Sequence, residues 1–193
     1  MTRASVEERP VPVVRTVLSF DEVYDRNFRF VWRVLRASGL PNAMVEDAAQ
    51  DVFVVVHRRL AEFEGRSDIR TWLFRIARWV VTSERRKLRA KRAHETEGAD
   101  DASLAEVRDK GPGPFEALAR SEAVRTLERV LGRMDPEKRM AFLLMDIEEM
   151  KAAEVAELLE INVNTVYSRL RLAREQFKLL LREGAQASEG SAP

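Results

Sequence analysis

Apolar residues recur at helical spacing along most of the chain, and this pattern limits it to an all-α fold. The first such segment contains Phe20, Tyr24, Phe28, Val31 and Leu35. Residues spaced in this way share one face of a helix. No segment sustains the period of two that marks a strand. Val54 to Val56 is β-prone locally, but helical neighbours on both sides favour a helix there.

The periodic pattern is interrupted once over a long stretch, and this predicts two small helical domains. Residues 93–114 are acidic, rich in small side chains, and end in Gly-Pro-Gly-Pro, which is the composition of a flexible linker. The predicted order is a flexible N-terminal arm (1–18), a helical domain (19–92), the acidic linker (93–114), a second helical domain (115–183) and a disordered tail (184–193).

Cap and turn residues divide the first domain into three helices. Ser19 and Glu22 can form a capping box, and Asn42 can cap the second helix. Gly65 lies in the turn before the third helix, which we expect to start near Ser67 or Asp68. The second helix should bury Val45, Ala49, Val52, Phe53, Val56 and Leu60, and expose Asp47, Gln50, Asp51 and Arg58.

The net charge of +1 conceals a strong segregation of charge. Residues 66–92 contain ten basic and two acidic side chains, whereas residues 95–116 contain seven acidic and two basic ones. Local potential rather than net charge attracts a polyanion. The basic block is therefore a candidate surface for nucleic acid.

The segment from Ala153 to Glu175 has the pattern of a helix-turn-helix. Its first helix contains Ala153, Val155, Ala156, Leu158 and Leu159, and Ala153 and Ala156 are small enough for close packing. Asn162 can cap a second helix that buries Val166, Leu170, Ala173 and Phe177. The side chains left exposed are Asn164, Thr165, Tyr167, Ser168, Arg169, Arg171 and Arg174.

In a helix-turn-helix the second helix enters the DNA major groove. Arginine matches guanine O6 and N7, and asparagine can bind adenine in the same bidentate way. The alternative is an exposed cationic helix on the surface of a bundle. Glu160 also lies in the turn, where a glycine would fit more comfortably.

The third helix interleaves aromatic and basic residues, which indicates single-stranded nucleic acid. Trp72, Arg75, Trp79, Ser83 and Arg86 fall on one side of this helix. Bases can stack on the rings while cations follow the phosphates. The alternative for Trp72 is an anchor in the core, whereas Trp79 is expected to be exposed.

Several function classes lack their signatures. The chain has no cysteine and only two histidines, His57 and His94, so we expect no disulfide and no zinc site. No apolar run is long enough for a membrane span, and the N-terminus lacks a signal-peptide core. There is no phosphate-binding loop and no nucleophile motif. We expect a cytoplasmic protein that is not an enzyme, has no cofactor and acts on no small-molecule substrate.

Both halves of the chain resemble extracytoplasmic-function (ECF) sigma factors of the sigma-70 superfamily. The segment "VEDAAQDVFVVVHRRLAEFEGRSDIRTWLFRIAR" resembles their second conserved region. The segment "LERVLGRMDPEKRMAFLLMDIEEMKAAEVAELLEINVNTVYSRLRLARE" resembles their fourth. "NTVYSRLRLAR" is the most specific part, and the resemblance covers about residues 19–183.

The resemblance implies a promoter-specificity subunit of bacterial RNA polymerase. Its first domain would bind the core enzyme and open the −10 element, and its second would bind the −35 element as duplex. Core contacts would be Asp47, Gln50 and Asp51. Contacts to −10 DNA would be Phe63, Glu64, Arg66, Ser67, Asp68, Arg70, Trp72, Arg75, Arg78, Trp79, Arg85 and Arg86. Contacts to −35 DNA would be the seven exposed residues from Asn164 to Arg174.

The resemblance also implies that the acidic linker follows the RNA path of the polymerase and that a cognate anti-sigma factor is a possible partner. The chain departs from the family pattern at four positions. Trp79 replaces a usual asparagine, and Ser83 a usual Asp or Asn. Glu149 and Glu160 lie near usual glycines. Either the −10 preference differs from that of the family or the third helix packs differently.

Two rival interpretations remain open from the residues. A stand-alone helix-turn-helix regulator would bind an operator unaided, but it needs neither the acidic-faced second helix nor the basic-aromatic third one. Such a regulator is usually a dimer, and no dimerisation helix is evident. A helical adaptor without a nucleic-acid role leaves the charge segregation unexplained.

Overall fold

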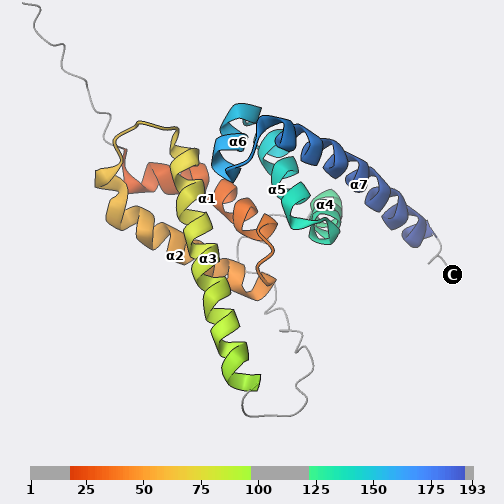
Figure 1. The fold of residues 1–193 in the computed structure, drawn as a ribbon, viewed down its shortest axis with the longest axis horizontal. Coiled ribbons are helices and arrows are strands. Elements are labelled where there is room, and N and C mark those ends of the chain that lie inside the picture. The colour runs from red at the N-terminus through yellow and green to blue at the C-terminus, as the bar shows by residue number, and fades with distance from the viewer. Residues whose placement is uncertain (1–17, 97–121, 190–193) are drawn as a thin grey trace, which may run out of the picture.

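The computed structural model describes residues 18–96 and 122–189, which are helical except for short turns (Figure 1). The first unit contains α1 (Phe20–Ala37), α2 (Asn42–Arg59), the 3-10 turn η1 (Leu60–Glu62) and α3 (Ile69–Thr96). The second contains α4 (Glu122–Arg133), α5 (Pro136–Phe142), the π-helical turn η2 (Leu143–Ile147), α6 (Ala152–Leu159) and α7 (Val163–Glu189). The described residues form no strand, and the all-α prediction is confirmed.

The N-terminal unit, α1 to α3, is a three-helix bundle in which each helix packs on the other two. Ser19 opens α1 with the predicted capping box: the Glu22 amide donates to Ser19 Oγ at 3.2 Å, and the Ser19 amide donates to the Glu22 carboxylate at 3.3 Å. Val45, Val52 and Val56 are fully buried as predicted. α3 is the longest helix, and its C-terminal half projects away from the bundle in Figure 1.

The C-terminal unit, α4 to α7, packs α4, α5 and α6 against α7. Asp135 caps α5 by accepting from the amides of Glu137 and Lys138, and Pro136 occupies the first turn, where its missing N–H is tolerated. Phe142 of α5 stacks on Phe177 of α7, with ring centroids 5.0 Å apart.

The two units are in contact and share apolar core. Val155, Leu158 and Val166 of the C-terminal unit belong to the same buried cluster as Leu73 and Ala77 of α3. A second, smaller cluster lies within the C-terminal unit, around Val130, Met134, Phe142, Leu170, Ala173 and Leu180. The larger apolar core therefore extends across the boundary between the units.

Several local predictions are wrong. Asn42 does not cap α2: the helix begins at Asn42 itself, with Pro41 in the cap position and no side-chain hydrogen bond. Pro41 has extended backbone angles, so the transition into the helix comes one residue early. Ala153 is exposed rather than packed, whereas Ala156 is buried in the core as predicted.

Two predicted boundaries are also wrong, because helices continue into segments read as irregular. Residues 93–96 belong to α3, and residues 184–189 belong to α7 rather than to a disordered tail. Adding a residue to a formed helix costs far less than nucleating a new one, and most of these residues are not strong helix breakers. The arm up to residue 17, linker residues 97–114 and the tail from residue 190 lie outside the described residues.

Candidate nucleic-acid interface

The turn between α6 and α7 has the geometry of a helix-turn-helix corner. Glu160 ends α6 in the left-handed conformation, with φ of 56°. The Ile161 amide returns to the Ala156 carbonyl at 3.0 Å, which closes the end of the helix. Asn162 then caps α7, accepting from the Asn164 amide at 2.8 Å. The chain thus passes from α6 to α7 through only three residues, 160–162.

The outer face of α7 is exposed and polar. Val166, Leu170 and Ala173 are buried beneath it as predicted. Tyr167 is 56% exposed even though its ring is apolar, so it is available to a partner. Of the remaining predicted contacts, Asn164, Ser168, Arg171 and Arg174 are exposed, while Thr165 and Arg169 are half-buried.

Each arginine on this face of α7 pairs with a carboxylate inside the C-terminal unit. Arg174 donates to both oxygens of Asp146, at 2.8 and 2.6 Å, and this hydrogen bond raises the pKa of its guanidinium. Arg171 donates to Glu175 at 2.7 Å, and Arg169 pairs with Glu137. Exposed pairs of this kind contribute little to stability, so DNA can exchange them for phosphates or bases.

The basic-aromatic helix α3 presents one tryptophan to solvent and packs the other. Trp79 is 62% exposed, which confirms the predicted exposure. Trp72 is partly buried against the core, and its ring lies 5.3 Å from that of Phe63. For Trp72 the structure supports the core-anchor interpretation. Arg85 and Arg86 are exposed further along the helix.

The loop before α3, residues 63–68, contains five of the predicted contacts to −10 DNA. Gly65 adopts φ of 70°, as its predicted place in the turn requires. Arg66 pairs with Glu64, and Asp68 Oδ1 accepts from the Arg70 amide at 2.7 Å. Glu64, Arg66 and Asp68 are exposed, whereas Phe63 and Ser67 are half-buried.

Three arginines of α3 that are predicted contacts to −10 DNA form ion pairs with the C-terminal unit in this structure. Arg70 pairs with Glu148, Arg75 with Glu157, and Arg78 with Glu160. The sequence analysis missed these glutamates as partners. No sequence signal links them to α3, because each pair joins residues about 80 positions apart.

The exposed face of α2 carries the predicted core-binding residues Asp47, Gln50 and Asp51 side by side. Val54 lies on the same face and is 47% exposed, which the sequence analysis did not include. Its position seven residues after Asp47 could have revealed it, because that spacing returns to the same side of a helix. An exposed apolar side chain on the same face as carboxylates suits a protein interface.

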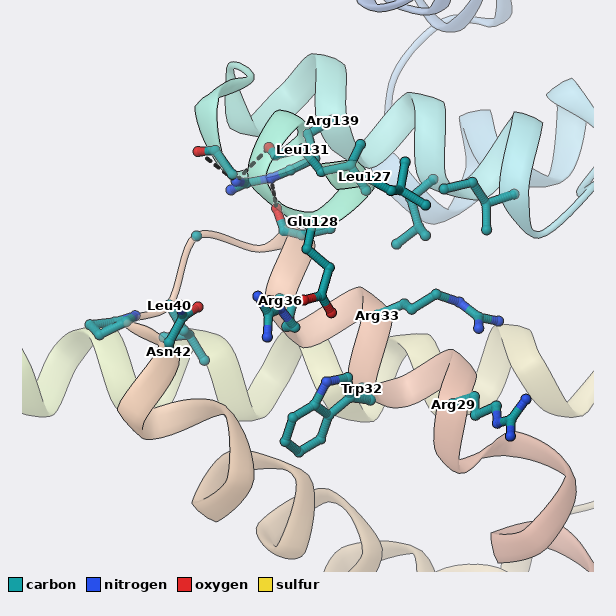
Figure 2. A pocket seen from close by; sticks show the side chains of 16 residues that line it. Arg29, Trp32, Arg33, Arg36, Leu40, Asn42, Leu127, Glu128, Leu131 and Arg139 are labelled. Carbon is teal, nitrogen blue, oxygen red and sulfur yellow. Dashed lines mark hydrogen bonds and ion pairs between the residues drawn. The ribbon is translucent and has the colours of Figure 1, made fainter. Parts of the chain in front are cut away.

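A cavity of about 750 Å³ lies at the seam between α1, α4 and α5. Figure 2 shows Glu128 reaching from α4 toward Arg36 of α1, with Trp32 nearby. The buried Arg139 donates to the Ala37 carbonyl at 2.9 Å, and burial lowers the pKa of its guanidinium. None of the predicted DNA contacts lines this cavity.

None of the helices in residues 18–96 and 122–189 is long and apolar enough to cross a membrane. Within the same residues, no group of His, Cys, Asp or Glu side chains is arranged to hold a metal ion.

The fold and its surfaces define a helical DNA-binding protein with a helix-turn-helix at its C-terminal end and a basic-aromatic helix in its N-terminal unit. Residues 23–91 match the family model of sigma-70 region 2, and residues 125–177 match that of sigma-70 region 4. The chain therefore belongs to the sigma-70 family, and its relatives place it in the ECF group.

Among the relatives is the RNA polymerase sigma factor NccH of Alcaligenes xylosoxydans xylosoxydans, 32% identical over 164 residues, which cover 84% of this chain and 87% of that protein. The ECF sigma-E factor of Escherichia coli K12 is 29% identical over 142 residues, covering 70% and 73%. The Bartonella quintana sigma factor RpoE, solved in complex with the anti-sigma factor NepR, has a similar fold, with a TM-score of 0.57 at 23% identity over 82% of this chain and 96% of that one.

Proposed function

We propose that this ECF sigma factor directs promoter-specific initiation by dividing the promoter between its two units. The C-terminal unit, with predicted limits 115–183, would bind the −35 element as duplex through α7. The N-terminal unit, with predicted limits 19–92, would bind core RNA polymerase and the melted −10 strand. The observation that carries the proposal is the pairing of an exposed polar recognition helix with a separate basic-aromatic helix in one chain.

The geometry of α7 supports duplex recognition. Asn164 is exposed in its first turn, and Tyr167 and Arg171 are exposed in the two turns that follow. A helix-turn-helix reads bases with residues near the start of its second helix. Asn164 and Arg171 are side chains that can make bidentate contacts with bases.

The geometry of α3 supports single-strand binding. The exposed Trp79 ring can stack on a base, and Arg75, Arg78, Arg85 and Arg86 can follow the phosphates. Because this chain has Trp79 where relatives usually have asparagine, we infer a −10 preference that depends more on stacking than on hydrogen bonds. The loop from Phe63 to Asp68 would capture an extruded base.

The exposed carboxylates of α2, with Val54 on the same face, supply the surface proposed for core polymerase. Anti-sigma factors are the partners named for two similar structures, RpoE with NepR and CnrH with CnrY. We infer that a factor of this kind regulates the present chain. A protein with these partners would act in the bacterial cytoplasm and contribute no catalytic step of its own.

The proposal is tested by transcription from genomic promoter fragments with bacterial core polymerase, in the presence and absence of the protein. Discrete transcripts that require the protein are expected, and their start sites locate the two promoter elements. An Asp51→Ala variant should lose co-elution with core, whereas Asp25→Ala, an exposed helical carboxylate on α1, should keep it. Footprints on duplex DNA by the protein alone, without core-dependent transcripts, would instead identify a stand-alone regulator.

A further inference from the structure

The cavity between α1, α4 and α5 has the size of a small-molecule site. Its volume of about 750 Å³ falls within the range of about 300–1,000 Å³ that ligand sites in proteins occupy. Figure 2 shows side chains of α4 on one side of it and side chains of α1 on the other. None of the predicted contacts to DNA or to polymerase lines it, so the proposed function leaves this cavity without a role.

One part of the cavity lining is apolar. Leu127 and Leu131 come from α4 and Trp32 from α1 (Figure 2), and Leu143 and Ile147 of η2 also line the cavity. Of these five side chains, only Leu143 is fully buried in the chain, and the other four are half-buried. A ligand with an apolar body would remove their exposed surface from water, which is the main favourable term for binding such a molecule.

The charged part of the lining is mostly cationic. Among the described residues that line the cavity, four are arginines and one is a glutamate: Arg29, Arg33, Arg36 and Arg139 against Glu128. Glu128 approaches Arg36 with an N···O distance of 3.7 Å, which is longer than a hydrogen bond. Arg33 pairs with Glu148, whose side chain is only 1% exposed. The lining therefore carries an excess of positive charge, which favours an anion.

Arg139 is a buried cation in this lining that lacks a carboxylate partner. It is 7% exposed, and its Nε donates to the Ala37 carbonyl at 2.9 Å and its Nη1 to the Leu131 carbonyl at 3.1 Å. Within residues 18–96 and 122–189 no carboxylate forms an ion pair with it. Burial lowers the pKa of this guanidinium more than the carboxylate of Asp135 raises it. Buried charges in proteins are normally paired, so an anion bound here would supply the missing charge.

Capping of helix ends explains only part of the Arg139 contacts. Its Nε and Nη1 bind carbonyls at the C-terminal ends of α1 and α4, where the helix dipole favours a cation. Its Nη2 is accessible and has no hydrogen-bond partner in the part of the chain that the structure describes.

The free Nη2 of Arg139 lies beside Gly39, 3.3 Å from the position that a Cβ atom would take there. Arg85 reaches the same glycine from α3, with its Nη2 3.8 Å from that position, and donates to the Ser38 carbonyl. Among the described residues no carboxylate pairs with Arg85 either. Two guanidinium groups therefore converge at Gly39, at one end of the cavity, as in a site for a carboxylate or a phosphate.

We propose that this cavity binds a small amphipathic anion. Its carboxylate or phosphate group would lie at Gly39, bound by Nη2 of Arg139. Its apolar body would lie between α1 and α4, against Leu127, Leu131 and Trp32. Guanidinium groups bind carboxylates and phosphates alike, so the two headgroups share one chemistry. The mainly aliphatic lining favours a hydrocarbon chain over a stacked base as the body of the ligand.

The test measures binding to the full-length chain by isothermal titration calorimetry, with decanoate and decyl phosphate below their critical micelle concentrations. We expect saturable binding of at least one of them, at least about 10-fold tighter than that of decanol, because hydrogen bonds to a charged group are strong. The cation decyltrimethylammonium should not bind. The tighter of the two anions identifies the headgroup. Inorganic phosphate alone should bind more weakly, because it lacks the apolar body.

The Glu128→Gln variant tests the cationic part of the site. Because an anion would compete with the Glu128 carboxylate for Arg36, removing that carboxylate should tighten binding by about 2- to 5-fold. The matched control is Glu175→Gln, which changes the charge equally at an exposed, ion-paired position of α7 outside the cavity. This control should leave the affinity unchanged.

The Leu127→Trp variant tests the apolar part of the site. The larger ring would occupy the space of the ligand's body and weaken binding by about 10-fold, which corresponds to the lost burial of about two methylene groups. The matched control is Leu172→Trp, at a position of α7 that is 38% exposed and lies outside the cavity. Thermal unfolding of each variant shows that the chain remains folded under the conditions of the titration.

Two results would overturn the proposal. The first is no saturable binding of either anion, or equal binding of decanoate, decanol and decyltrimethylammonium, which would show only unspecific adsorption to apolar surface. The second is an affinity that neither Glu128→Gln nor Leu127→Trp changes, because binding would then occur elsewhere on the chain. Since the titrations contain neither DNA nor polymerase, their outcome is independent of the proposed function.

Discussion

The helices α3 and α7 carry the two proposed DNA-binding surfaces, yet their arginines are held in different ways. On α7, Arg171 and Arg174 pair with carboxylates of the same unit. On α3, Arg75 and Arg78 pair with carboxylates of the other unit. Movement of the units relative to each other therefore changes the availability of α3 and leaves α7 as it is.

This difference determines how the arginine pairs on each helix can open. The pairs on α7 are local, so any polyanion that reaches the helix can exchange with them one at a time. The pairs on α3 are joined to the buried Glu148 and to the shared apolar core, so they must open together. We infer that the arginines of α7 exchange partners one at a time, whereas those of α3 do so together.

The largest effect is expected from Glu148→Ala, which removes the buried carboxylate at the contact between the two units. Loss of a buried carboxylate leaves Arg33 and Arg70 without their shared partner. Because both arginines are more than a third exposed and can be rehydrated, we expect a loss of about 2–3 kcal/mol rather than the full cost of an unpaired buried charge. Urea unfolding of the full chain measures this loss.

The neighbouring exposed Glu149→Ala is the control for that measurement. It should change the free energy of unfolding by less than about 0.5 kcal/mol, as surface substitutions usually do. Equal effects at the two positions would show that Glu148 does not hold the units together.

A second prediction concerns the exposed face of α7 and uses the Arg171→Ala variant. We expect about 1–3 kcal/mol less binding at one base of the −35 element, with single-stranded −10 affinity unchanged. Binding to a set of duplexes with single-base changes measures this, and the effect should vanish when the contacted base is replaced. Arg182→Ala, exposed further along α7, should lower affinity less and for all sequences alike.

The Trp79→Ala variant tests the proposed stacking of bases on α3. Loss of one stacking platform should weaken single-strand binding by about 1–2 kcal/mol and slow promoter opening more than initial duplex binding. Permanganate footprints of the melted region follow this directly. Unchanged melting would remove the stacking role. Trp72→Ala should instead lower the stability of the N-terminal unit, because that ring packs on Phe63 and the core.

Much of this architecture could be predicted from local sequence. The buried faces of α2 and α7 follow helical periodicity, and the caps at Ser19 and Asn162 use side chains within three residues of the amides they bind. The exposure of Trp79 follows from its side of the helix. Such features depend only on neighbours in the sequence.

The contact between α3 and the C-terminal unit could not be predicted from local sequence. Nothing in the local sequence distinguishes Glu148, Glu157 and Glu160 from ordinary surface carboxylates, and their partners on α3 are about 80 residues away. Helix ends were also misjudged at Thr96 and Glu189, because continuation of a formed helix depends on small free-energy differences per residue. The roles of the predicted contacts with DNA and polymerase stay predictions.

The smallest expected effect comes from glycine substitutions at the two left-handed glutamates. Glu149 and Glu160 have φ of 55° and 56°. Glu149→Gly should stabilise the chain by about 0.5 kcal/mol, because relief of backbone strain slightly exceeds the entropy cost of glycine. Glu160→Gly gains the same relief but loses the Arg78 pair, an exposed contact worth up to about 1 kcal/mol.

The difference between these two unfolding free energies therefore isolates the Arg78 pair with the backbone effect cancelled. A smaller gain for Glu160→Gly than for Glu149→Gly, narrowing as salt screens the pair, would assign the difference to the contact between the units. Equal gains at all salt concentrations would leave Glu148 and the shared apolar core as the contacts that hold α6 on α3.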